Sequence, residues 1–171
     1  WSVMADSTHV KGLSDLHAFM QALPLKIEKN ILRSALRAGT NEIKAEAQAQ
    51  LAAHGNVKTG QLAKGLKVST RAKGGVVTAT LKAKGKHSAI AHWLEFTGAA
   101  PHVIKGKNGG GLSFGGKTFK AINHPGFKPR PFLRPALDSK AGAAVVAVGN
   151  AIKARLTKEG INTADVEIDE I

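Results

Sequence analysis

Apolar side chains recur at helical spacing in two long stretches of the chain, which predicts two long amphipathic helices. The first is predicted from Pro24 to about Ala53, because proline suits a first helical turn. Its apolar positions are Leu32, Leu36, Ile43, Ala47 and Leu51. The second is predicted to end at about Lys158. Its apolar positions are Leu137, Ala141, Ala144, Val145, Val148, Ile152 and Leu156. Gly39 lies on the first apolar face, so we expect another element to approach closely there.

Shorter segments between these helices predict two hairpins. Residues 66–71 and 76–82 are predicted strands, joined by a tight turn at Gly74-Gly75. A second hairpin is predicted around Gly115-Gly116, which apolar residues flank on both sides. With a short helix over 15–22, the order of elements predicts an α+β fold: a small antiparallel sheet, two long helices and an extended loop hairpin over about 101–124.

Composition and charge refine this picture. A chain of 171 residues with 43% hydrophobic residues suits one globular domain, predicted over 1–158. Residues 159–171 hold five carboxylates and no Lys or Arg, so they are predicted to be a flexible acidic tail with little core-forming power. The preceding residues then carry a net charge of +18. Such a field predicts a polyanionic partner, either the phosphate backbone of DNA or an acidic protein face.

Several classes of site are disfavoured. The chain has no cysteine, which excludes disulfides and thiolate metal sites. Its apolar runs fall short of the ~18–20 residues that a membrane span needs, so we expect no membrane partner. The charged residues among the first twenty, including Asp6 and Lys11, disfavour a signal peptide.

Residues 111–118 match the phosphate-loop string G-x-x-x-x-G-K-[ST] letter for letter. A phosphate loop requires a buried strand before it and a helix directly after it. The glycine-rich residues before 111 and the nearby His124-Pro125-Gly126 favour neither element. We therefore interpret Gly115, Gly116 and Lys117 as a hairpin tip and expect no cofactor.

Glu95 is the single carboxylate between Ala47 and Leu137. A metal site formed by Glu95 with His92, His102 and His124 is conceivable, but no metal-binding spacing is present. Paired-carboxylate catalysis would require a distant second acid. We expect no metal and no catalytic residue, and we expect Glu95 to pair with a neighbouring Arg or Lys.

Five strings resemble the neck and tail-completion family of long-tailed double-stranded DNA phages. Four of them are Lys58–Leu62, His92–Gly98, Pro101–Ile104 and Leu112–Phe114. The fifth and most distinctive is His124–Ala136. The resemblance covers about Leu25 to Lys158 in order.

The resemblance implies a non-enzymatic structural virion protein with an α+β fold. It implies a six-fold homo-oligomeric ring at the head–tail joint, assembled in the host bacterial cytoplasm. The implied partners are head-connector or head-closure proteins and tail-terminator or tail-tube proteins. The alternatives are a sequence-nonspecific DNA-binding protein and a nucleotide-using enzyme.

Prolines 129, 131 and 135 stiffen the approach to the last helix, which lowers the entropy lost on docking. Apolar and arginine side chains around them are suited to packing and to directional contacts. The candidate assembly and packing residues are His92, Trp93, Glu95, Phe96, Phe127, Arg130, Phe132, Leu133 and Arg134.

Overall fold

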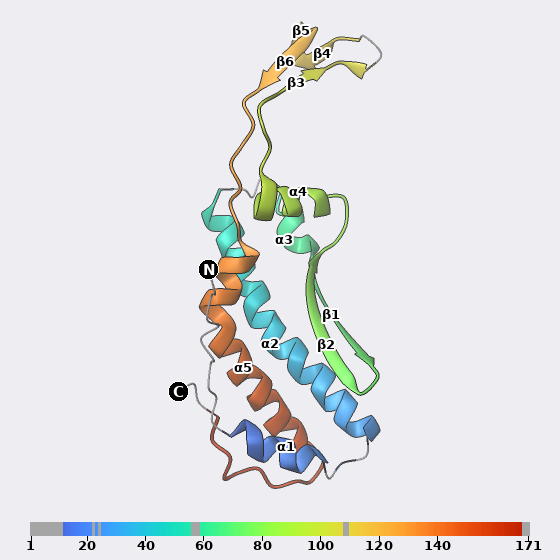
Figure 1. Ribbon diagram of the computed structural model, residues 1–171, viewed down its shortest axis with the longest axis vertical. Coiled ribbons are helices and arrows are strands. Elements are labelled where there is room, and N and C mark those ends of the chain that lie inside the picture. Colours follow the sequence, from blue (N-terminus) through green and yellow to red (C-terminus); the bar gives the residue numbers. More distant parts are fainter. Residues whose placement is uncertain (1–11, 22, 24, 56–58, 108–109, 169–171) are drawn as a thin grey trace.

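The computed structural model describes residues 12–21, 23, 25–55, 59–107 and 110–168. Two long helices, α2 (Leu25–Ala53) and α5 (Leu133–Lys158), lie side by side, and a hairpin of β1 (Leu66–Lys73) and β2 (Val76–Ala83) packs along α2 (Figure 1). The predicted α+β class is confirmed. The predicted helix start at Pro24, Lys58 of the predicted turn and residues 169–171 of the tail lie outside the described residues.

The two long helices approach closely at Gly39, which is buried in α2. A Cβ at this position would collide with the carbonyl oxygen of Ala144 and lie 2.6 Å from Cγ2 of Val148, both on α5. Only a residue without a side chain allows this approach, so the predicted role of Gly39 is confirmed.

Among the described residues, the body has two apolar clusters. The lower core joins the short helix α1 (Leu13–Gln21) to one end of the helix pair. Its buried members are Leu16, Met20, Ile31, Ala35, Ile152, Leu156, Val166 and Ile168. The upper core lies at the other end, beneath the start of α5. Its buried members are Ala47, Leu51, Leu66, Ala91, Leu94, Phe132 and Ala136.

The first predicted hairpin is confirmed. Strands β1 and β2 pair antiparallel from Leu66 opposite Ala83 to Lys73 opposite Val76. Gly74 and Gly75 form the turn with φ of 57° and 80°, a left-handed conformation that glycine adopts without a steric penalty.

The second hairpin is part of a longer arm that points away from the body (Figure 1). The stem of the arm pairs β3 (His102–Lys105) with β6 (Ala121–His124), and its tip pairs β4 (Leu112–Phe114) with β5 (Lys117–Phe119). We call residues 101–124 the arm. Lys117 begins a strand and not a helix, so the phosphate-loop string is a hairpin, as predicted.

Helix α5 begins at Leu133, four residues before the first apolar position that we assigned to it. The prediction that Pro135 stiffens the approach to the last helix was therefore wrong, because Pro135 lies within α5. Pro135 is the third residue of α5, where backbone N–H groups have no partner within the helix. A proline is tolerated there because it removes no intrahelical hydrogen bond.

The segment after α5 also differs from the prediction. We predicted little core-forming power for residues 159–171, but Val166 and Ile168 are each only 7% exposed and belong to the lower core. Asp165 and Glu167 alternate with them and are exposed. The Lys153 ammonium donates a hydrogen bond to the Val166 carbonyl at 2.6 Å, which attaches this segment to α5.

Candidate functional site

All nine predicted assembly and packing residues lie where the arm joins the body. On the outgoing side, α4 (Ser88–His92) runs directly into η1 (Trp93–Thr97), a single π-helical turn. On the returning side, residues 125–132 lead into α5. We call residues 92–99 together with 126–134 the arm base.

The carboxylate of Glu95 is the central group of the arm base. Its side chain is 2% exposed. Oε2 accepts hydrogen bonds from the backbone N–H groups of Phe132 and Leu133, each at 2.9 Å, and Oε1 accepts one from the N–H of Arg134 at 3.1 Å. The Nε of Arg134 forms an ion pair with Oε1 at 3.3 Å. The predicted ion pair of Glu95 is thus present.

These contacts explain why α5 begins at Leu133. The first turn of a helix presents unpaired N–H groups and a partial positive charge, which a carboxylate satisfies well. A serine, threonine, aspartate or asparagine usually supplies the oxygen from the N-cap position. Here the N-cap residue is Phe132, whose side chain has no acceptor. Glu95 supplies the acceptor from η1 instead.

The environment lowers the pKa of Glu95 below its usual value. Burial alone raises the pKa, because it disfavours the charged form. The hydrogen bonds from Leu133, Phe132 and Arg134, together with the charge of Arg134, outweigh burial. The carboxylate is therefore ionised at neutral pH and holds the two sides of the arm base together.

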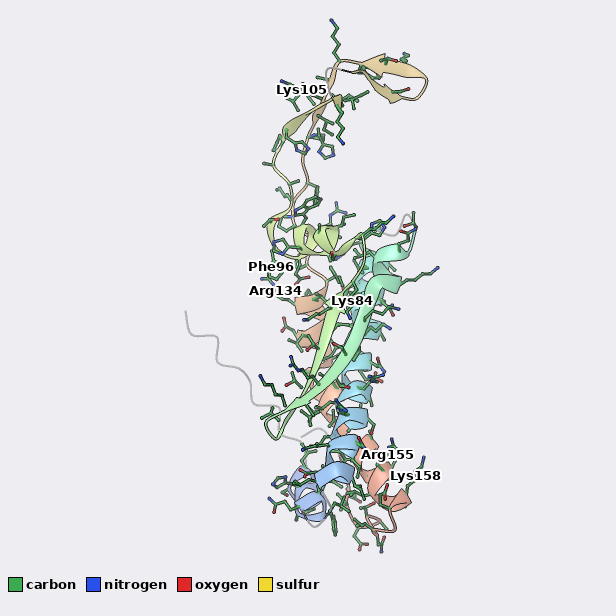
Figure 2. The ribbon with its side chains drawn as sticks, turned by 90° about the vertical axis from the view of Figure 1, so that its right-hand side faces the viewer. Lys84, Phe96, Lys105, Arg134, Arg155 and Lys158 are labelled. Carbon is green, nitrogen blue, oxygen red and sulfur yellow. The ribbon has the colours of Figure 1, made fainter. Side chains whose placement is uncertain are left out.

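Arg134 connects the buried carboxylate to the surface. Its Nη2 donates a hydrogen bond to the Glu95 carbonyl at 3.1 Å, and its guanidinium carbon lies 4.8 Å from the centre of the Phe96 ring (Figure 2). The Phe96 ring also lies beside the ring of His92, with ring centres 5.2 Å apart. Phe96 is still 57% exposed and Trp93 is 47% exposed. The arm base thus presents aromatic side chains and an arginine to solvent.

The two sides of the arm base are also joined by backbone contacts. Ala99 and Phe127 exchange two hydrogen bonds, each at 2.9 Å, and the N–H of Arg130 donates to the Leu94 carbonyl at 2.7 Å. Gly98, at φ 64°, lies against this bridge, where a Cβ would collide with the Phe127 carbonyl oxygen. The sequence did not show this role of Gly98, Ala99 and Leu94, because it depends on backbone pairing between distant segments.

The remaining predicted residues have different surroundings. Phe132 is fully buried in the upper core, so it packs within the chain and is not available to a partner. Arg130 is exposed, and its Nη1 donates to the His54 carbonyl at 3.2 Å. Gly115, Gly116 and Lys117 lie at the far end of the arm, apart from the arm base.

The arrangement of the histidines does not suit a metal site. Both oxygens of Glu95 are occupied by N–H donors, and the rings of His102 and His124 stack on the arm at 5.0 Å. Among the residues that the structure describes, no three His, Asp or Glu side chains are grouped to hold a metal ion. The arm base is therefore suited to positioning side chains for contact.

Residues 14–96 match the model of a protein family described as "Bacteriophage HK97-gp10, putative tail-component". The match runs from α1 to η1 and includes Glu95, and it ends before the arm and α5. It confirms the resemblance to phage tail proteins over these residues and indicates a structural tail component.

The chain has no match among curated proteins or among solved structures. Within the described part of the chain, every helix is too short or too polar to cross a membrane.

Proposed function

We propose that this chain is a structural virion protein of the phage neck and tail-completion region. It forms a six-fold ring at the head–tail joint and docks onto head-connector or head-closure proteins and onto tail-terminator or tail-tube proteins. It performs no reaction and holds no cofactor or metal. The observation that carries the proposal is the arm, which leaves the body on a firmly held base and whose side chains lie outside both apolar cores of the described residues.

The arm exposes the kind of surface that a partner covers. Val103 is 53% exposed, and Ile104 and Phe119 are about as exposed as Phe127 at the arm base. Exposed apolar side chains and unpaired strand edges are typical of protein interfaces. The arm also carries four lysines and no carboxylate, which suits an acidic partner face.

Ring formation follows from the asymmetry of such a contact. An arm that docks on a different surface of the next copy makes a heterologous interface, which closes into a ring when it is repeated by rotation. The six-fold symmetry of the proposal comes from the resemblance to phage neck proteins. The aromatic side chains and Arg134 of the arm base are the candidate contacts beside the arm.

Deleting the arm tests this proposal. Residues 101–124 would be replaced by a short Gly-Ser linker, which keeps the Ala99–Phe127 bridge. We expect the thermal midpoint to change little, because the side chains of the arm lie outside both cores. We expect the variant to lose self-assembly in light scattering and to fail to restore infectious particles in a complementation assay. Wild-type titres with the arm deleted would contradict the proposal.

A matched control distinguishes apolar contacts of the arm from electrostatic attraction by its lysines. Lys105 and Lys117 changed to Gln remove two arm charges and leave its apolar residues in place. If apolar docking dominates, this variant restores more infectious particles than the deletion does. Equal failure of both would assign the contact to charge.

The nucleotide-using alternative is contradicted by β5, because a strand begins at Lys117 where a phosphate loop requires a helix. The second candidate function is sequence-nonspecific contact with DNA. It is favoured by a groove on the body that arginine side chains of α2 and α5 line.

A further inference from the structure

A groove of about 670 Å³ runs along α2 between β1 and the end of α5. Its charged lining consists of Arg33, Arg37, Arg155 and Glu159. A second depression of about 370 Å³ shares Arg33 with it and adds Lys29 and Lys73. We call the two together the basic groove, because five cations and one carboxylate line it.

The spacing of the cations on α2 is regular. Lys29, Arg33 and Arg37 follow one another at intervals of four residues, so they share one side of the helix at a rise of about 6 Å each. The carboxylates of the same helix, Glu28, Glu42 and Glu46, do not line the groove. Helix α2 therefore presents a continuous row of positive charge.

The arginines are held without being neutralised. Nη2 of Arg37 donates to the Thr70 hydroxyl at 3.5 Å, and Nε of Arg155 donates to the Ser34 hydroxyl at 3.4 Å. Both acceptors are uncharged. Within the described part of the chain, none of the groove arginines is paired with a carboxylate. Their positive charge can therefore act on an anionic partner.

We infer that the basic groove binds the phosphate backbone of double-stranded DNA. Arginine and lysine side chains, with hydroxyl and amide groups such as those of Ser34 and Asn30, are the usual donors to phosphate oxygens. The inference rests on the proposed function, because it requires a place in a particle through which DNA passes.

An acidic protein segment suits the groove less well. Protein partners insert apolar or aromatic anchors into pockets at the centre of an interface. Of the two apolar residues that line the groove, Ile31 is only 3% exposed and Ile27 is half-buried, so the groove offers little apolar surface for an anchor. Contact with phosphates requires no apolar anchor, and it carries no base specificity.

The test is fluorescence anisotropy of a labelled DNA duplex with the full chain, at salt concentrations from about 50 to 200 mM. Arg33 and Arg37 are changed together to Gln. The slope of log affinity against log salt should fall by about 1 for each phosphate that the variant no longer neutralises, so by about 2 in total. Affinity should fall at least about tenfold at the lowest salt.

The matched control is the arm variant with Lys105 and Lys117 changed to Gln, which removes the same charge. Lys105 lies at the opposite end of the molecule from Arg155 (Figure 2), and Lys117 lies in β5 at the tip of the arm. We expect this variant to keep the wild-type slope. An equal loss in both variants would assign binding to net charge and overturn the inference. Tighter binding of poly-glutamate than of DNA, abolished in the groove variant, would also overturn it. If the first variant does not fold, Lys73 and Arg155 changed to Gln provide the same test.

The two proposals fail separately. DNA binding by the purified chain does not depend on assembly. If the groove variant loses DNA binding and the arm deletion still restores infectious particles, the DNA-binding proposal stands and the ring proposal is wrong. If the arm deletion loses infectivity and the groove variant binds DNA as the wild type does, the ring proposal stands and the DNA-binding proposal is wrong.

Discussion

Glu95 is one side chain on which two distant segments depend. Its carboxylate caps the N-terminus of α5 and pairs with Arg134, while its own backbone carbonyl accepts a hydrogen bond from the same arginine. The charged state of Glu95 therefore contributes to the stability of the whole arm base.

The substitution Glu95→Gln should lower the free energy of unfolding at pH 7 by about 1.5–3 kcal/mol, the range for a hydrogen bond to a charged group. Because folding lowers the pKa of Glu95, its contribution to the free energy of unfolding is complete above the unfolded pKa of about 4.5. The contribution is lost as the pH falls through the folded pKa. Urea unfolding of both proteins from pH 7 to pH 3 measures this, and the difference between them should shrink in acid.

The control for this prediction is Glu42→Gln on the exposed surface of α2. It should change the unfolding free energy by no more than about 0.5 kcal/mol, which is usual for a surface substitution. A constant difference between wild type and Glu95→Gln at every pH would show that the carboxylate charge is not involved.

The sequence predicted part of this residue-scale picture. A lone carboxylate in a basic field indicated an ion pair, and Arg134 provides it. The cap was not predictable, because capping rules search the residues next to a helix start, and Glu95 precedes its helix by 38 residues. The N-cap Phe132 gave no signal, so the predicted helix began too late.

At the scale of elements, the contact of α2 with α5 depends on Gly39. The substitution Gly39→Ala should destabilise the fold by about 1–3 kcal/mol, because the added methyl group collides with α5 at Ala144 and Val148. In an exposed helix the same change would stabilise by ~1 kcal/mol through helix propensity. Urea unfolding shows whether Gly39→Ala lowers or raises the free energy of unfolding. A stabilised variant would contradict the close approach of the two helices.

The segment after α5 should contribute to stability. The substitution Ile168→Ala should cost about 2–5 kcal/mol, the range for a large aliphatic side chain removed from a core. Leu137→Ala deletes a similar volume at a site that is 50% exposed and should cost much less. Thermal unfolding of both variants measures this. Equal midpoints would show that residues 161–168 do not stabilise the lower core.

The acidic composition of this segment concealed its packing. Asp165 and Glu167 alternate with Val166 and Ile168, so an extended chain places the carboxylates on one side and the apolar groups on the other. The net charge of the segment indicated a solvated tail. The alternation of charged and apolar residues instead indicated a segment with one exposed side and one buried side.

At the scale of the whole molecule, elements with local patterns were predictable. The long helices, both hairpins and the arm follow from periodicity and glycine turns along one stretch of chain. The arm base and the basic groove join side chains from separate elements, such as Arg33 on α2 and Arg155 on α5. The candidate residues of the arm base were named from the sequence, but which of them touch, and that α2, β1 and α5 enclose a groove, became visible only in the structure.

The construction of the arm base has a mechanical consequence. Both ends of the arm are fastened to the start of α5, through the Ala99–Phe127 bridge and the carboxylate of Glu95. A pull on the arm therefore passes into α5 and, through Gly39, into α2, so the two longest helices carry the load together (Figure 1).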